Sequence, residues 1–100
     1  MRSAPIAGVT TTTAIVAAPG AGRRIVVRGY AVSLDAAGEI LWESASDNLT
    51  GLMELAADTP LSPGFGESDV VLVCGTNEAL NLTSTAAANG HVLYEIVSVL

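Results

Sequence analysis

The sequence predicts an all-β protein, an antiparallel β-sandwich or small jelly roll of seven to eight short strands. Three observations lead to this fold class. Segments rich in Val, Ile, Thr and Tyr recur along the chain. Gly, Pro, Asn and Asp separate them roughly every 8 to 12 residues, which is the spacing of a sandwich or barrel. No segment carries a convincing helical pattern.

The C-terminal stretch, residues 75–100, is the strongest of these segments. Residues 80–83 alternate apolar and polar side chains, and after a small-residue turn residues 91–100 continue without Pro or Gly. We therefore expect a hairpin. Its second strand is too long and too apolar to stand alone in water, so a second sheet must cover it.

The N-terminal half supplies further strands. Residues 9–18 are β-branched almost throughout. Residues 23–34 alternate two faces, and we assign the smaller, uncharged face, which runs from Ile25 to Ser33, to the core. Gly29, in the middle of this strand, is typical of a bulge or of a close approach of another strand.

The next segments are shorter. Residues 39–44 form a strand with the only Trp on its core face. Residues 49–55 have helical spacing but lie among strands, and we favour extended structure. Residues 57–68 hold two Pro and two Gly and form a long loop. Residues 69–74 are apolar on both faces, which predicts a central strand that is covered on both sides.

These segments form one domain at residues 9–100, preceded by an unpatterned arm at residues 1–8. The expected core consists of Ile25, Val27, Ile40, Trp42, Val71, Val73, Leu80, Leu82, Tyr94 and Ile96.

The composition excludes some classes of partner. Of 100 residues, half are apolar and 14% are charged, and the net charge of −6 comes from ten acids, four Arg and no Lys. This balance disfavours nucleic acid and anionic membranes. The apolar excess indicates a small symmetric oligomer, and an Ala- and Val-rich monomer remains the alternative.

Catalysis has few residue types to work with, and we expect no catalytic, cofactor or metal site. The chain has one histidine, His91, which shares a strand face with Glu95, and two ligands do not hold a metal tightly. The one cysteine, Cys74, lies in an apolar run and reads as a buried small hydrophobe. Two of the scattered acids could meet across a cleft as a glycosidase pair, but we favour a solvated surface.

Several short motifs, taken in their order, resemble the small jelly-roll head decoration (cement) proteins of tailed bacteriophages. The motifs are residues 22–27, 40–44, 49–51, 55–57, 78–82 and 90–94. The resemblance covers roughly residues 9–97. The chain departs from the pattern at residues 69–74 and at the preceding loop, residues 60–66, whose role the resemblance does not explain.

The resemblance implies a non-enzymatic virion protein, made in the cytoplasm of a bacterial host and bound to the outer surface of the capsid. It implies a homotrimer at three-fold and quasi-three-fold positions, with the major capsid protein as partner. The candidate capsid-contact residues in the arm are Arg2, Pro5, Ile6 and Val9. The alternative is a jelly-roll module on the virion that binds glycans or the host surface, with Trp42 and Tyr30 as stacking platforms.

Overall fold

The computed structural model describes residues 2–63 and 70–99. Within these ranges the chain forms nine strands and no helix, and the paired strands are antiparallel. The strands are β1 (Arg2–Val9), β2 (Thr13–Val16), β3 (Arg23–Leu34), β4 (Gly38–Ser44), β5 (Asp47–Asn48), β6 (Met53–Leu55), β7 (Leu72–Val73), β8 (Leu80–Ser84) and β9 (Ala88–Ser98). The prediction of an all-β, antiparallel fold is confirmed.

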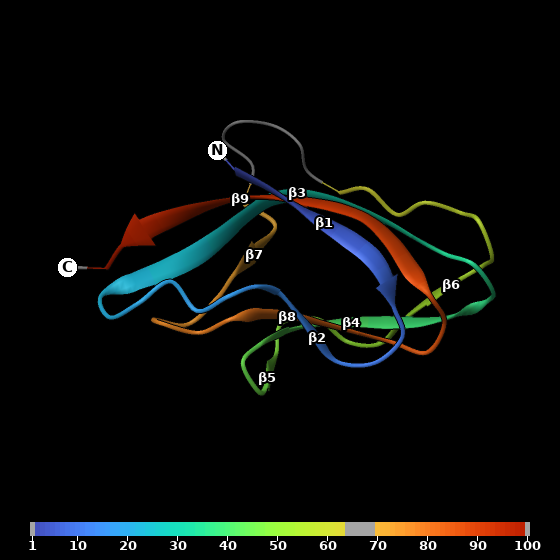
Figure 1. Ribbon diagram of the computed structural model, residues 1–100, viewed down its shortest axis with the longest axis horizontal. Helices are drawn as coiled ribbons and strands as arrows, with labels where there is room; N and C mark the ends of the chain where they lie inside the picture. Colours follow the sequence, from blue (N-terminus) through green and yellow to red (C-terminus); the bar gives the residue numbers. More distant parts are fainter. Residues whose placement is uncertain (1, 64–69, 100) are drawn as a thin grey trace.

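The strands form two sheets that enclose one core. Sheet A has the order β1-β9-β3-β7, and sheet B has the order β2-β8-β4-β5 with β6 also paired to β4. Figure 1 shows β9 and β3 in one layer and β8 and β4 in the other. The largest fully buried side chains are Trp42, Ile25, Leu34, Ile40, Leu80 and Leu82.

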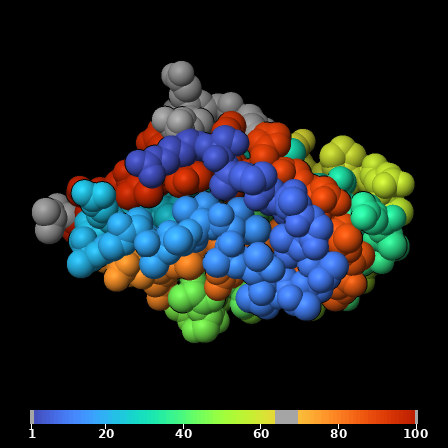
Figure 2. Space-filling view, in the orientation of Figure 1, coloured from blue at the N-terminus to red at the C-terminus, as the bar shows by residue number. Residues whose placement is uncertain are grey.

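The expected N-terminal arm is instead the edge strand β1, which pairs with β9. Ile6 and Val9 are 3% and 6% exposed, so they belong to the core. A chain end is ordered when it is hydrogen-bonded into a sheet, and burial of two apolar side chains stabilises that pairing. The expected strand at residues 9–18 is consequently divided: β1 ends at Val9 and β2 enters sheet B. Figure 2 shows these N-terminal segments covering one side of the molecule.

Strand β3 follows the predicted faces only as far as a bulge. Ile25 and Val27 are fully buried as expected, but the register with β9 shifts at Arg28. One extra residue reverses the alternation of faces in the rest of a strand. Ala31 and Ser33 are therefore only half-buried, and the core positions pass to their neighbours. These neighbours are Tyr30, Val32 and Leu34.

The expected strand at residues 69–74 is not central, and the side chains that it buries are not Val71 and Val73, which were expected in the core. β7 is short and lies at the edge of sheet A beside β3. Leu72 and Cys74 are buried, Val71 is partly buried, and Val73 is 40% exposed. A segment that is apolar on both faces carries no alternation from which the phase could be predicted. Residues 64–69 of the expected loop and strand lie outside the described residues.

The expected C-terminal hairpin does not form, because β8 lies in sheet B and β9 in sheet A. The residues between them cross from one sheet to the other. β9 pairs along its length with β3 and also with β1, and both are longer than β8. The long apolar strand is thus central, and sheet B covers it as the sequence required. Its Tyr94 is partly buried against the core, whereas Ile96, also expected there, is half-buried near its end.

The first part of the long loop is ordered along sheet A. Leu61 and Val32 exchange two backbone hydrogen bonds, of 2.8 and 3.0 Å, and the Asp58 amide donates to the Leu34 carbonyl at 2.8 Å. These contacts cover the edge of β3 beyond β7. The expectation of extended structure at residues 49–55 holds for its last three residues, which form β6.

Candidate interaction surface

The outward side of sheet A carries an apolar hollow with arginines in its lining. It has a volume of about 570 Å³. Its lining residues, which we call the valine–arginine surface, are Arg24, Val26, Arg28, Val70, Val73, Val97, Ser98 and Val99. Val70 and Val73 are 55% and 40% exposed. Exposed valines that gather on one face are typical of a contact surface rather than of scattered surface residues.

The sheet register explains how these side chains come together. Arg24 lies opposite Val97 of β9, and Val26 lies between Glu95 of β9 and Val73 of β7. Residues that pair across strands project from the same face. The face opposite to Ile25 and Val27 is therefore the outward one.

The two arginines of this surface differ in their surroundings. Arg28 Nη2 lies 3.4 Å from Glu95 Oε2, a partly buried ion pair on the same face. Arg24 Nε is buried and has no hydrogen-bond acceptor among the described residues. Buried donors are almost always paired in native proteins. Arg28 Nε is in the same position, so the two residues differ in their ion pairs: Arg28 pairs with Glu95, and Arg24 makes no ion pair among the described residues.

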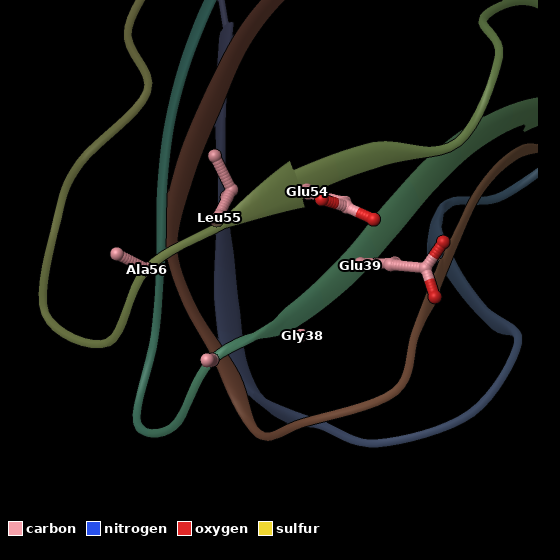
Figure 3. A pocket seen from close by; sticks show the side chains of 6 residues that line it. Gly38, Glu39, Glu54, Leu55 and Ala56 are labelled. Atoms are coloured by element: carbon pink, nitrogen blue, oxygen red, sulfur yellow. The ribbon is translucent and has the colours of Figure 1, made fainter.

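A second hollow, on the outward side of sheet B, is acidic. It has a volume of about 520 Å³ and contains Glu39 of β4 and Glu54 of β6. These two residues are directly paired across the strands, and Figure 3 shows their carboxylates on the same side of the two strands. Like charges in this position repel each other. Glu54 is exposed and Glu39 is half-buried, so the pair is accessible to a cation or to solvent.

More acidic and apolar side chains continue this outward side. Glu39, Leu41 and Glu43 alternate with the buried residues of β4, and Leu52, just before β6, is 63% exposed. We call the set of Glu39, Leu41, Glu43, Leu52 and Glu54 the acidic surface.

Glu43 is held in place by a chain of hydroxyl groups. Thr83 Oγ1 donates to Glu43 Oε1, and the Thr12 and Thr83 hydroxyl oxygens lie 2.7 Å apart. Because the Thr83 proton is used on Glu43, Thr12 is the donor to Thr83. Of the Thr row, which the sequence assigned to a strand, Thr13 begins β2, and Thr12 just before it supports the threonine that binds a surface carboxylate.

Most of the chemically suggestive residues from the sequence lie in the core. Trp42 is 0% and Tyr30 3% exposed, and their ring centroids lie 4.9 Å apart. Burial raises the pKa of the Tyr30 hydroxyl, and the neighbouring Trp42 indole opposes part of this shift. The indole Nε1 nevertheless makes no hydrogen bond of good geometry within the described residues. Neither ring is available for stacking on a sugar.

Cys74 and its neighbours form a small polar cluster inside the protein. Ser44 Oγ donates to Glu78 Oε1 at 2.7 Å and accepts from the Gly75 amide at 2.8 Å. Burial is the main cause that raises the pKa of the Cys74 thiol, a hydrogen bond with Ser44 opposes it, and the Glu78 charge adds to it. A protonated, buried thiol is a poor nucleophile. The cluster closes the turn between β7 and β8.

The other expected site residues are dispersed. Arg2 and Pro5 are exposed on the edge strand, while Ile6 and Val9, expected beside them as contacts, are buried. His91 is exposed on β9, and Glu95, its expected companion, is paired with Arg28. In the part of the chain that the structure describes, no three or more His, Cys, Asp or Glu side chains gather where they could hold a metal.

Sequence reasoning missed the valine–arginine surface, although its signal was present. Arg24, Val26 and Arg28 alternate along one strand face, and residues 69–74 form the segment predicted to be apolar on both faces. Alternating Arg and Val on one face, together with a segment that is apolar on both faces, is typical of a contact surface.

No protein-family model, curated protein or solved structure matches the chain. The described residues contain no helix that is long and apolar enough to cross a bilayer.

Proposed function

We propose that this protein is a non-enzymatic assembly protein, a head decoration protein that binds as a trimer to the capsid of a tailed bacteriophage. The resemblance of its strand motifs supplies the identity of the partner, the major capsid protein, and the site of action, the outer surface of the virion. The observation that carries the assembly role is the valine–arginine surface, which leaves exposed valines beside the half-buried Arg24.

The arrangement of strands supports the jelly-roll part of the proposal. A jelly roll is a double sheet of about eight strands in two Greek keys. Here the chain changes sheet after each strand except within β4–β6, so that β1, β3, β7 and β9 form one sheet and β2, β4, β5, β6 and β8 form the other. If β5 and β6 are counted as the two parts of one strand, this is the eight-stranded pattern. Because folds host many functions, the fold supports but does not carry the proposed role.

The coat contact is assigned to the edge of β1. Arg2 and Pro5 are exposed there. Strand β1 is at the end of sheet A, so one of its edges pairs with β9 and the other has no neighbouring strand in that sheet. An exposed arginine is suited to a carboxylate of a coat subunit. Three such contacts on one rigid trimer act together through effective concentration, so each can be weak.

The test is co-sedimentation of the purified protein with expanded and unexpanded heads of the phage that encodes it. We expect saturable binding to heads, and reduced binding for Arg2→Glu. Arg23→Glu, which makes the same charge change on β3 at another exposed position, is the matched control and should bind like the wild type. Absence of wild-type binding to both kinds of head would refute the proposed function. Deleting residues 1–8 is a poor test, because the deletion removes the buried Ile6 and uncovers β9.

A further inference from the structure

Charge is divided between the two sheets. All four arginines lie in strands of sheet A, in β1 and β3, and Glu95 is the one acid of the described residues in that sheet's strands. The strands of sheet B contain four acids, Glu39, Glu43, Asp47 and Glu54, and no arginine. A chain with a net charge of −6 therefore presents a basic, apolar face and an acidic face on opposite sides of its core.

The valine–arginine surface defines the chemistry of whatever covers it. Its floor needs apolar side chains, because Val70 and Val73 are exposed to solvent. Its half-buried Arg24 carries a positive charge that makes no ion pair among the described residues, and a carboxylate forms the strongest hydrogen bonds with a guanidinium. A partner must thus present leucine- or valine-like groups flanked by carboxylates.

Two copies cannot satisfy this requirement with the same face. A symmetric contact between two valine–arginine surfaces would bring the arginines of both copies together in a shielded interface. Like charges that are brought together in an interface disfavour binding. A two-fold contact through this surface is therefore disfavoured on electrostatic grounds.

The acidic surface of the same protein meets the requirement. It carries Leu41 and Leu52 beside Glu39, Glu43 and Glu54, and Leu52 and Glu54 are exposed. Leucines would cover the valines while the carboxylates approach Arg24. The pairing of unlike faces makes the contact heterologous, and such contacts close into a ring or continue as a filament.

We propose that the valine–arginine surface of one copy binds the acidic surface of a second copy, head to tail. The contact deepens the assembly role proposed above and rests on it, because it names the interface between subunits. It does not depend on which shell the protein decorates. Because the two surfaces lie on opposite sides of the core, repeated contacts of this kind stack copies along one direction.

The test uses two single variants with opposite charge changes, Arg24→Glu and Glu54→Arg. Sedimentation velocity over a range of concentrations at low salt measures self-association, and circular dichroism checks the fold. We expect the wild type to associate and each variant to associate at least tenfold more weakly. An equimolar mixture of the two variants should associate again, since position 24 of one then meets position 54 of the other with opposite charge.

Arg23→Glu is the matched control for Arg24→Glu. Arg23 is adjacent in sequence and exposed, but it does not line the hollow. It should leave association unchanged.

Three results would overturn the proposal: a wild type that is monomeric at every concentration, equal weakening by Arg23→Glu and Arg24→Glu, or a mixture that stays dissociated. A monomer that still sediments with heads would overturn this contact and leave the shell-binding role intact. A protein that associates with itself but does not sediment with heads would support this contact and refute the shell-binding role.

Discussion

At the scale of single residues, Gly90 is the position where the fold tolerates least. Its φ of 147° is one that L side chains rarely adopt, and a Cβ built there would overlap the carbonyl oxygen of Ala31 on the neighbouring strand. The opposing group is backbone, so it cannot turn away as a flexible side chain could. The close approach lets β9 pass tightly against β3 at its N-terminal end.

We expect Gly90→Ala to lower the free energy of unfolding by at least about 2 kcal/mol, from overlap and backbone strain together. Gly51→Ala is the control, because Gly51 has no atom within 4 Å of a built Cβ. Urea denaturation followed by circular dichroism measures both. Equal stability of the two variants would show that β9 and β3 are not in close contact at this point.

Two buried weakly acidic groups, the Cys74 thiol and the Tyr30 hydroxyl, make the free energy of unfolding depend on pH in the alkaline range. Burial raises the pKa of the Cys74 thiol and of the Tyr30 hydroxyl. Unfolding returns them to ordinary values, roughly 8.5 and 10. As pH rises through those values, the unfolded state releases protons that the folded state retains, so stability decreases.

The free energy of unfolding should therefore fall above about pH 8.5, by up to about 1.4 kcal/mol per pH unit for each group. Urea titrations between pH 7 and 10.5 test this. Cys74→Ala should remove the first part of the decrease and Tyr30→Phe the part that begins near pH 10. If both variants follow the wild-type profile, other groups cause the effect.

At the scale of elements, β7 shows that one strand has two roles. Leu72 is 8% exposed and packs in the core, while the adjacent Val73 is 40% exposed on the valine–arginine surface. We expect Leu72→Ala to lower stability by about 2 kcal/mol or more, because it removes buried groups and leaves a cavity. Val73→Ala should change monomer stability by less than about 0.5 kcal/mol.

Association should respond in the opposite way, with Val73→Ala weakening it at constant fold. Urea denaturation together with sedimentation separates the two effects. A large stability loss in Val73→Ala would mean that its side chain is covered within one copy, as the sequence had indicated.

Features that depend on a local pattern of side chains could be predicted from the sequence, whereas features that depend on pairing between distant strands could not. The strand class follows from β-branched composition, and the core face of β4 follows from Ile40 and Trp42, which are fully buried. The bulge at Arg28 was foreseeable in kind, through Gly29, but its effect on the following faces depends on register with β9. Such pairing between distant segments is set by tertiary structure and leaves no local pattern.

The interaction surface was less predictable for the same reason. Arg24 and Val97 are far apart in sequence, and only the β3–β9 register brings them opposite each other. The pattern of residues 69–74, apolar on both faces, predicts a strand that is covered on both sides. In the structure the same pattern leaves Val70 and Val73 exposed, and the proposed contact assigns their covering layer to a second copy.

At the scale of the whole molecule, the separation of charge between the two sheets gives the protein one basic face and one acidic face. The basic face of sheet A and the acidic face of sheet B attract across copies, while the overall charge of −6 repels. At low ionic strength the two effects compete, and near contact the short-range attraction between unlike faces is less screened than the repulsion between whole molecules. Orientation rather than net charge then decides how copies meet.

Salt separates the contributions of valines and charges to self-association. The Debye length falls from roughly 10 Å at 0.1 M to roughly 3 Å at 1 M salt, so exposed charge pairs weaken while apolar contacts do not. If Arg24 and the glutamates orient the contact, the dissociation constant should rise from 0.1 to 1 M sodium chloride. Glu54→Gln should reduce this dependence, because it removes one charge without changing the size of the side chain. Sedimentation equilibrium gives both slopes, and association that strengthens steadily with salt would mean that the valines alone hold the copies together.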